Sequence, residues 1–239
     1  MKIIDAFWEK RNLGVTTVEV KIDATDTVDE IAAALTDISA EYQVIRAPVS
    51  RFDIYTLLQQ TGFTFIETMY QMVFDFARND INWGKYDDQV SYKEVCNEEE
   101  LETVFSNIRN GLFENNRISL DSRFSKEHAD KRYIGMINDK LAQGGKVCSI
   151  IHKKEEIGFF ATREMEEKNY EYFLAGIYTN FQKKGLGSNA YTQMLAYVKS
   201  NGAITVTGGV SMNNVGSYKM FNQSGFKLGS VEYVFIKHT

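Results

Sequence analysis

A short glycine-containing stretch is the strongest candidate for chemistry in this sequence. The segment 182–188 reads QKKGLGS, and an amphipathic run of residues follows it. Because glycine has no side chain, backbone N–H groups around Gly185 and Gly187 can converge on a phosphate group at the start of a helix. Lys183 and Lys184 could add electrostatic attraction, although solvated surface lysines are the commoner case. The stretch therefore predicts a phosphate-binding loop.

Two well-known kinds of phosphate loop fit this stretch poorly. A Walker loop needs a lysine and then a serine or threonine directly after its last glycine, whereas serine and asparagine follow Gly187. A dinucleotide-binding loop could use Gly185, Gly187 and Ala190, but it requires an acidic residue about 20 residues later. The predicted strand 203–210 contains no aspartate or glutamate. A dinucleotide such as NAD is therefore the weaker alternative ligand.

A second motif follows the glycine loop at a definite distance. Residues 214–226 read NVGSYKMFNQSGF. Together with QKKGLG at 182–187, this order and spacing resemble the two characteristic segments of the GNAT acetyltransferases. In that family the first segment binds the pyrophosphate of acetyl-CoA, and the second lines its pantetheine arm and thioester. The resemblance covers about Val90 to Thr239 and implies an acetyl-CoA-dependent N-acetyltransferase acting on a primary amine.

The same resemblance implies the fold and the residues that contact acetyl-CoA. The expected fold is α+β, with a mixed central sheet flanked by helices. Backbone N–H groups near Gly176 to Tyr178 would polarise the thioester carbonyl. The residues expected to bind the cofactor are Gly176, Ile177, Tyr178, Gln182, Lys183, Lys184, Gly185, Leu186, Gly187, Ser188, Asn214, Ser217 and Phe221.

Phe221 departs from the family pattern. Members of the family often have a tyrosine at this position, which donates a proton to the departing sulfur, and phenylalanine has no hydroxyl to do so. Tyr218, one helical turn earlier, is the alternative donor, although a tyrosine beside a core helix more often only packs there. A thiol with a pKa of about 8.5 is also a good leaving group by itself. The departure leaves a second class of function open, a GNAT-like module that binds CoA without catalysis.

A closer resemblance extends over almost the whole chain. The segments WEKRNLGVTTVEVKI, LLQQTGFTFIE and NQSGF resemble members of the family that acetylate a nucleotide-linked 4-amino-4,6-dideoxy sugar. Glu67 matches the position of a carboxylate proposed there as general base. Arg117 and Arg123 would bind the diphosphate of such an acceptor through bidentate hydrogen bonds. The alternatives are an exposed strand glutamate and two surface arginines.

The elements that must position these residues follow from periodicity and from helix-capping residues. Asp26 and Thr27 can cap one helix and Asn97 another. The predicted helices are 28–38, about 54–62, from 98 onward, 126–141, 186–198 and 214–223. The predicted strands are 42–47, 64–76, 90–95, 146–152, 156–164, 170–178, 203–210 and a last strand that ends near Lys237.

The chain is expected to contain two related domains. The segment 44–74 resembles the segment 204–236, because each contains a strand, a helix, a Gln-Thr-Gly-Phe or Gln-Ser-Gly-Phe stop and another strand. Chance recurrence of this common unit is the alternative. We predict a smaller α/β domain at 1–85 that is a partial GNAT copy, then a GNAT domain at 90–239. The polar segment 78–88 is the predicted boundary.

Composition excludes several other classes of protein. A net charge of −5 argues against a nucleic-acid partner, and no apolar run approaches the roughly 20 residues that span a bilayer. The first residues have no apolar segment typical of a signal peptide, so we expect a cytoplasmic protein with two buried thiols, Cys96 and Cys148. The three histidines are scattered, which predicts no metal site. The expected partner is a small-molecule amine, and a homodimer stays open.

Overall fold

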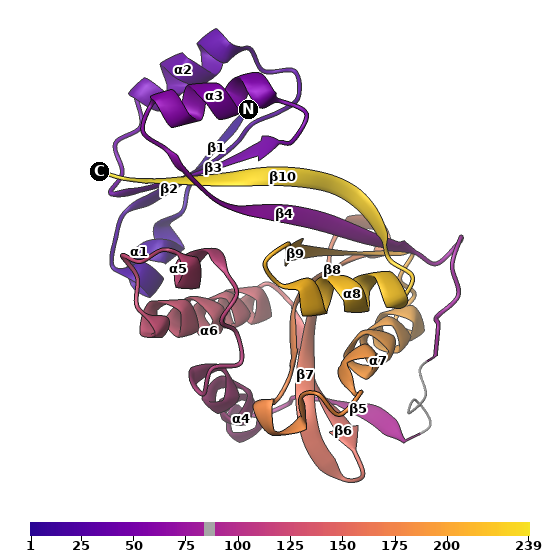
Figure 1. The fold of residues 1–239 in the computed structure, drawn as a ribbon. Coiled ribbons are helices and arrows are strands. Elements are labelled where there is room, and N and C mark those ends of the chain that lie inside the picture. The colour runs from indigo at the N-terminus through magenta and orange to yellow at the C-terminus, as the bar shows by residue number, and fades with distance from the viewer. Residues whose placement is uncertain (84–88) are drawn as a thin grey trace.

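The strands form one continuous ten-stranded sheet, shown in Figure 1. The structure is a computed structural model that describes residues 1–83 and 89–239. The strand order is β1-β2-β3-β10-β4-β9-β8-β7-β6-β5. Two neighbouring pairs are parallel, β2 with β3 and β8 with β9, and the others are antiparallel, so the sheet is mixed.

The strands are β1 (Lys2–Asp5), β2 (Thr17–Lys21), β3 (Tyr42–Pro48), β4 (Thr64–Asp75), β5 (Val90–Glu94), β6 (Lys146–His152), β7 (Glu155–Glu164), β8 (Asn169–Ile177), β9 (Thr205–Ser211) and β10 (Lys227–His238). The helices are α1 (Phe7–Leu13), α2 (Val28–Thr36), α3 (Phe52–Gln60), α4 (Glu98–Arg109), α5 (Arg117–Leu120), α6 (Lys126–Ala142), α7 (Gly187–Ser200) and α8 (Val215–Gln223). Two short 3-10 turns are η1 (Glu166–Lys168) and η2 (Thr179–Phe181). In the described residues no helix is long and apolar enough to cross a bilayer.

Local chemistry explains why the predicted helices begin where they do. Thr27 caps α2 in a capping box, in which its side chain accepts from the Glu30 N–H and the Glu30 carboxylate accepts from the Thr27 N–H. The Asn97 side chain accepts from the Glu100 N–H and caps α4. The predicted boundary segment 78–88 lies partly outside the described residues. The elements β1, α1, β2 and α5 were not predicted.

The first part of the chain repeats the topology of the last part. The unit β2-α2-β3-α3-β4 and the unit β8-α7-β9-α8-β10 each begin with a strand that runs parallel to the next strand of the unit. The two copies exchange their last strands, since β10 lies between β3 and β4 while β4 lies between β10 and β9. Figure 1 shows β4 and β10 side by side across the middle of the molecule. The predicted division at 85–90 stays a prediction, and the sheet itself runs through both copies.

Apolar side chains cover both faces of this sheet. In the first copy, Ile31 of α2 and Leu58 of α3 pack with Ile45 and Phe235 on one face. On the other face, Tyr42, Val44, Val234 and Ile236 pack with residues of α1, α5 and α6. Neighbouring strand residues therefore point to opposite faces, as a pleated sheet requires. Around β7, apolar residues of α4 and α6 cover one face and those of α7 cover the other.

The two cysteines differ in exposure. Cys148 is buried in β6, but Cys96 is exposed just before α4. The expectation of two buried thiols is therefore wrong for Cys96, which lies in a loop after the edge strand β5.

Candidate active site

The two central parallel strands separate at one end. The strands β8 and β9 pair from Asn169 and Thr205 as far as Tyr172 and Gly208, and their pairing ends there. Both strands continue further, to Ile177 and Ser211. A side chain at Gly208 would meet the rings of Phe221 and Tyr172 at 3.0 Å, so glycine lets α8 pack closely where the strands part. The opening between the strands leads to two adjoining cavities.

The first cavity, of about 420 Å³, extends from the glycine loop to the opening between the strands. We call it the donor cavity. Several residues predicted to bind acetyl-CoA line it, namely Gly176, Ile177, Gln182, Gly187, Asn214 and Ser217. These residues come from β8, from the glycine loop and from the start of α8. The tertiary structure therefore brings together three segments that are separate in the sequence.

The glycine loop has a backbone suited to binding an anion. Lys183 has φ of 61° and Gly185 has φ of 77°, so the chain turns sharply before α7 begins at Gly187. Within the described part of the chain, the N–H groups of residues 183–188 form no backbone hydrogen bond. The Gln182 side chain donates to the Ile177 carbonyl at 3.0 Å and ties the loop to the end of β8. Free N–H groups at a helix start suit a phosphate.

The second cavity, of about 210 Å³, lies on the other side of the opening. We call it the acceptor cavity. It contains Glu67 and is lined by Arg46, Arg117 and Arg132. The two cavities share a boundary formed by Phe113, Asn115, Tyr133, Ala175, Tyr191, Asn214 and Ser217. A molecule in one cavity can therefore meet a molecule in the other at this boundary.

A β-bulge in β4 turns Glu67 toward the acceptor cavity. In the pairing with β10, Val234 is opposite Glu67 but Phe235 is opposite Phe65, so one residue, Ile66, is extra. Phe65 packs against the Phe235 ring on the α3 face, and strict alternation would send Glu67 to that face too. With the bulge, Glu67 lines the acceptor cavity. It is only 6% exposed, and its Oε2 has no hydrogen-bond partner in the described structure.

The arginines of the acceptor cavity are held by carboxylates behind them. Glu9 of α1 accepts a hydrogen bond from Arg132 Nε at 2.7 Å, and it lies 3.5 Å from Arg117 Nη2. Arg46 forms an ion pair with Glu19. Burial raises the pKa of Glu19, but the charge of Arg46 and other arginines outweighs this and lowers the pKa to about 2. Glu19 is therefore charged at neutral pH.

Arg117 has unused hydrogen-bonding capacity. It is only 4% exposed, and its Nε and Nη2 form no hydrogen bond with described residues. Burial lowers the pKa of Arg117, but the nearby Tyr42, Glu19 and other acids outweigh this effect and raise it. The side chain is thus a buried cation that forms an ion pair with Glu9 through Nη2 and keeps hydrogen-bonding capacity that suits a carboxylate or phosphate.

Several residues predicted for the site lie elsewhere. Tyr178 is buried in the core beside α4, and its N–H donates to the Ile157 carbonyl at 2.8 Å, so this N–H is not free for a thioester. The Leu186 side chain packs in the core under α7, and only its backbone belongs to the glycine loop. Tyr218 packs against Tyr70, with ring centroids 5.3 Å apart, and lines neither cavity. These positions have packing roles because their side chains face the sheet.

The remaining predicted residues divide between the loop and a separate surface. Lys183, Lys184, Gly185 and Ser188 lie in or next to the glycine loop without lining either cavity. The Lys184 ammonium group lies 5.0 Å from the centre of the Phe181 ring. Arg123 lines a different cavity, near Gly62 and His238. Of the two predicted acceptor arginines, only Arg117 faces the cavity of Glu67.

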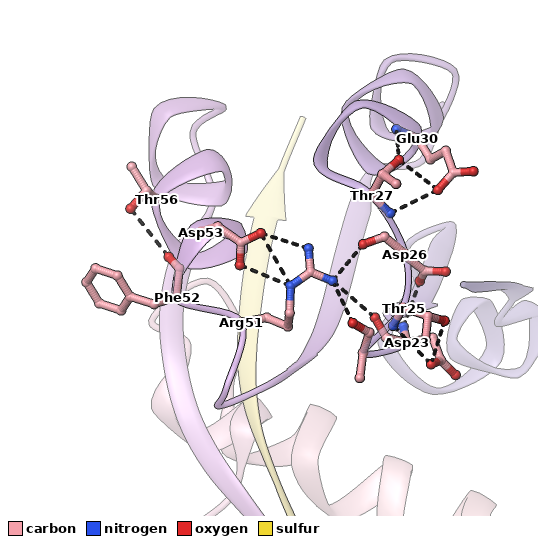
Figure 2. Close-up of polar contacts among 10 residues, drawn as sticks. Asp23, Thr25, Asp26, Thr27, Glu30, Arg51, Phe52, Asp53 and Thr56 are labelled. Carbon is pink, nitrogen blue, oxygen red and sulfur yellow. Dashed lines mark hydrogen bonds and ion pairs between the residues drawn. The ribbon is translucent and has the colours of Figure 1, made fainter.

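In the first copy, the position that corresponds to the donor cavity is occupied by the Arg51 side chain. Arg51 precedes α3 as Asn214 precedes α8, and the β2–α2 loop corresponds to the glycine loop. Figure 2 shows the Arg51 guanidinium directed at this loop, where it donates to the Asp26 carbonyl at 2.6 Å and the Ala24 carbonyl at 3.2 Å. It also binds the Asp53 carboxylate at 2.8 Å. An acidic loop bound to an arginine offers no site for a pyrophosphate.

Sequence reasoning missed several residues of the site. These are Arg46, Arg132 and Tyr191, none of which carries a local sequence signal of a role in the site. The WEKRN segment did carry a signal, because Glu9 within it supports Arg117 and Arg132. That signal could not be interpreted without knowing that α1 packs against α6.

Comparisons with known proteins agree with this geometry. Residues 111–226 match the sequence model of the Acetyltransferase (GNAT) family. A GCN5-related N-acetyltransferase from Sphaerobacter thermophilus is 9% identical, with a TM-score of 0.68 over 99% of this chain and 75% of that chain. A GCN5-related N-acetyltransferase from Kribbella flavida is 17% identical, with a TM-score of 0.56 over 93% of this chain and 81% of that chain.

A tandem GNAT protein from the clavulanic acid biosynthesis pathway is 10% identical, with a TM-score of 0.57 over 93% of this chain and 75% of that chain. No curated protein sequence matches the chain significantly. The structural matches show the fold, and the fold class predicted from the sequence is confirmed. The mixed, largely antiparallel sheet is not the parallel sheet of a dinucleotide-binding fold, so the described structure lacks the fold that the NAD alternative requires.

Proposed function

We propose that this chain, an acyltransferase whose residues 111–226 match the GNAT family, transfers an acetyl group to a primary amine. The donor of the acetyl group is acetyl-CoA. The observation that carries this proposal is the meeting of two cavities where β8 and β9 part. The donor cavity reaches the free N–H groups of the glycine loop. The acceptor cavity contains a buried carboxylate, Glu67, with an unpartnered oxygen.

The donor cavity suits acetyl-CoA for physical reasons. The N–H groups of residues 183–188 would bind the pyrophosphate, with Lys183 and Lys184 adding positive charge nearby. The pantetheine arm would lie between β8 and β9, where the two strands no longer pair with each other beyond Tyr172 and Gly208. The thioester would then reach the boundary that the two cavities share.

The acceptor cavity supplies a base for the reaction. An amine must lose a proton when it attacks the thioester carbon, and Glu67 is the carboxylate that lines this cavity. General-base assistance of this kind contributes roughly 10²–10⁴ in rate. Glu67 would take the proton while the C–N bond forms and the C–S bond breaks.

The arginines favour an acceptor that carries negative charge. Arg117 keeps unused hydrogen-bonding capacity, and Arg46 and Arg132 line the same cavity. The sequence resemblance to TDP-fucosamine N-acetyltransferase suggests that the charge is the diphosphate of a nucleotide-linked amino sugar. We therefore propose this class of acceptor, with Arg117 and Arg132 in the role first expected of Arg117 and Arg123.

The experiment that tests this function measures release of free CoA thiol from acetyl-CoA. The purified protein is incubated with a panel of nucleotide amino sugars, the matching sugar 1-phosphates, neutral amino sugars and amino acids. We expect turnover with the nucleotide-linked amines and little with neutral ones. Acetyl-CoA binding without turnover on any amine would instead favour a non-catalytic module.

A further inference from the structure

Phe221 has no hydroxyl group to interact with the departing sulfur, but neighbouring tyrosines have one. Its ring is 2% exposed and is packed among aromatic rings, with centroid distances of 4.9 Å to Tyr191 and 5.7 Å to Tyr172. Phe221 also lines the acceptor cavity near the boundary with the donor cavity. No hydroxyl group can come from Phe221 itself, but two tyrosine hydroxyls belong to the same cluster.

Tyr191 is the member of this cluster that touches both cavities. It lies in α7, one turn after the glycine loop, and it lines the donor cavity and the acceptor cavity. Tyr172 lines only the acceptor cavity. The thioester must lie at the boundary of the two cavities, because the amine arrives from one side and acetyl-CoA from the other. Tyr191 is therefore within the region where the C–S bond breaks.

The Tyr191 hydroxyl belongs to a small polar group where the two cavities meet. Ser217, which also lines both cavities, and Tyr172, which lines the acceptor cavity, are its side-chain hydrogen-bond partners. Burial raises the pKa of Tyr191 to about 12, so the phenol keeps its proton at neutral pH. A phenol carries one O–H donor that rotates about the C–O bond, so Tyr191 can donate to an acceptor that enters the boundary.

We propose that the Tyr191 hydroxyl donates a hydrogen bond to the sulfur of CoA as it departs, and so replaces the hydroxyl that Phe221 lacks. This role rests on the proposed acetyl transfer. The amine nitrogen forms a bond to the carbonyl carbon, and its proton passes to Glu67. The C–S electron pair moves onto sulfur, and CoA leaves as a thiolate that takes a proton from solvent. Tyr191 keeps its proton throughout and stabilises the negative sulfur.

Other tyrosines fit this role less well. Tyr218 packs on Tyr70 and lines neither cavity. Tyr133 lines both cavities, but it comes from α6 and its ring packs against Phe113, with centroids 4.6 Å apart. Tyr191 is the tyrosine at the shared boundary whose ring contacts Phe221.

The decisive measurement is the pKa of the thiol of bound CoA, which needs no acceptor. The thiolate absorbs in the ultraviolet, so a titration of the CoA complex against free protein gives this pKa. In the wild-type protein we expect it below the ordinary value of about 8.5. Tyr191→Phe should raise it by about one unit or more, since a hydrogen bond to a charged group is worth roughly that much. Tyr191→Phe should also lower kcat about 10-fold.

Two further variants separate chemistry from packing. In the double variant Tyr191→Phe with Phe221→Tyr, the hydroxyl returns on the neighbouring ring, and both the thiol pKa and kcat should recover. Tyr197→Phe is the matched control, because Tyr197 lies in the same helix but packs against Tyr92 and Phe160 away from both cavities. It should change neither quantity.

The outcomes for this role and for acetyl transfer are distinct. An unchanged thiol pKa in Tyr191→Phe, or loss of CoA binding in that variant, would overturn the role of Tyr191 even if the wild-type protein acetylates amines. A raised thiol pKa in Tyr191→Phe, in a protein that acetylates no amine, would support the contact with sulfur and reject the proposed transferase activity.

Discussion

Glu9 and Arg132 join the first helix of the chain to the wall of the acceptor cavity, with Glu9 Oε1 and Arg132 Nε 2.7 Å apart. Glu9 is 1% exposed and also lies 3.5 Å from the Nη2 of Arg117. One carboxylate therefore supports two arginines of the proposed acceptor site. The N-terminal copy thus contributes to the site even though its own cofactor position is filled by Arg51.

Glu9→Gln should destabilise the protein, because Arg117 would keep a buried charge with less compensation. Removing one member of a buried ion pair typically costs about 3–5 kcal/mol. Urea denaturation measures the change in the free energy of unfolding. Lys10→Gln is the control, since the Lys10–Glu41 pair is exposed and should be worth little. Equal small effects of both substitutions would mean that Glu9 does not hold the arginines in place.

Glu67→Gln should lower kcat/KM at least ~10-fold, within the usual range for loss of a general base. The deficit should shrink as pH rises, because more of the acceptor amine is then already neutral. A pH–rate profile of thiol release from acetyl-CoA measures both effects. A deficit that is the same at every pH would assign Glu67 to binding or packing, and a wild-type rate would remove it from catalysis.

Gly187→Trp should weaken acetyl-CoA binding about 10-fold or more, because the indole would occupy the donor cavity that Gly187 lines. A β-carbon at this position would lie 3.3 Å from the Sδ of Met220, which lines the same cavity. Calorimetry with acetyl-CoA gives the affinity. Ser200→Trp, at the exposed far end of α7, is the control and should bind normally. Normal binding by a folded Gly187→Trp protein would exclude the loop from the site.

Each chain should bind one molecule of CoA, although the fold contains two related copies. In the first copy Arg51 already binds the loop that would receive a pyrophosphate, and that loop is acidic (Figure 2). The stoichiometry from calorimetry should therefore be close to one, and Arg51→Ala should leave it unchanged. A value near two would show that the first copy also has a working site.

Only one of the two cysteines should react rapidly with a thiol reagent in the folded protein. Cys96 is exposed, whereas Cys148 is buried. Burial and the nearby Glu94 raise the pKa of Cys148 to about 12, so very little thiolate forms at neutral or mildly alkaline pH. Labelling with a chromogenic disulfide should show one fast thiol, and the second only after denaturant is added. Loss of the fast phase in Cys96→Ser would identify the reactive residue.

Local patterns were sufficient for most of the individual elements and for the two segments that line the donor cavity. Helix caps such as Thr27 and Asn97 act within a few residues, so they can be recognised in the sequence. The glycine loop and the segment from Asn214 to Phe226 have a definite spacing in the sequence, and both line the donor cavity. Helix and strand periodicity also revealed the resemblance between segments 44–74 and 204–236.

The acceptor site depends on contacts that no local pattern contains. The bulge at Ile66 that turns Glu67 into the cavity exists only because β4 pairs with β10. Arg117 and Arg132 are positioned by Glu9, more than a hundred residues away, once α1 packs on α6. The sequence by itself therefore determined the fold class and the glycine loop proposed to bind acetyl-CoA, because these follow from short-range backbone geometry. Only the tertiary structure decided which carboxylate, arginines and tyrosine face the cavities, because burial and strand exchange arise between distant segments.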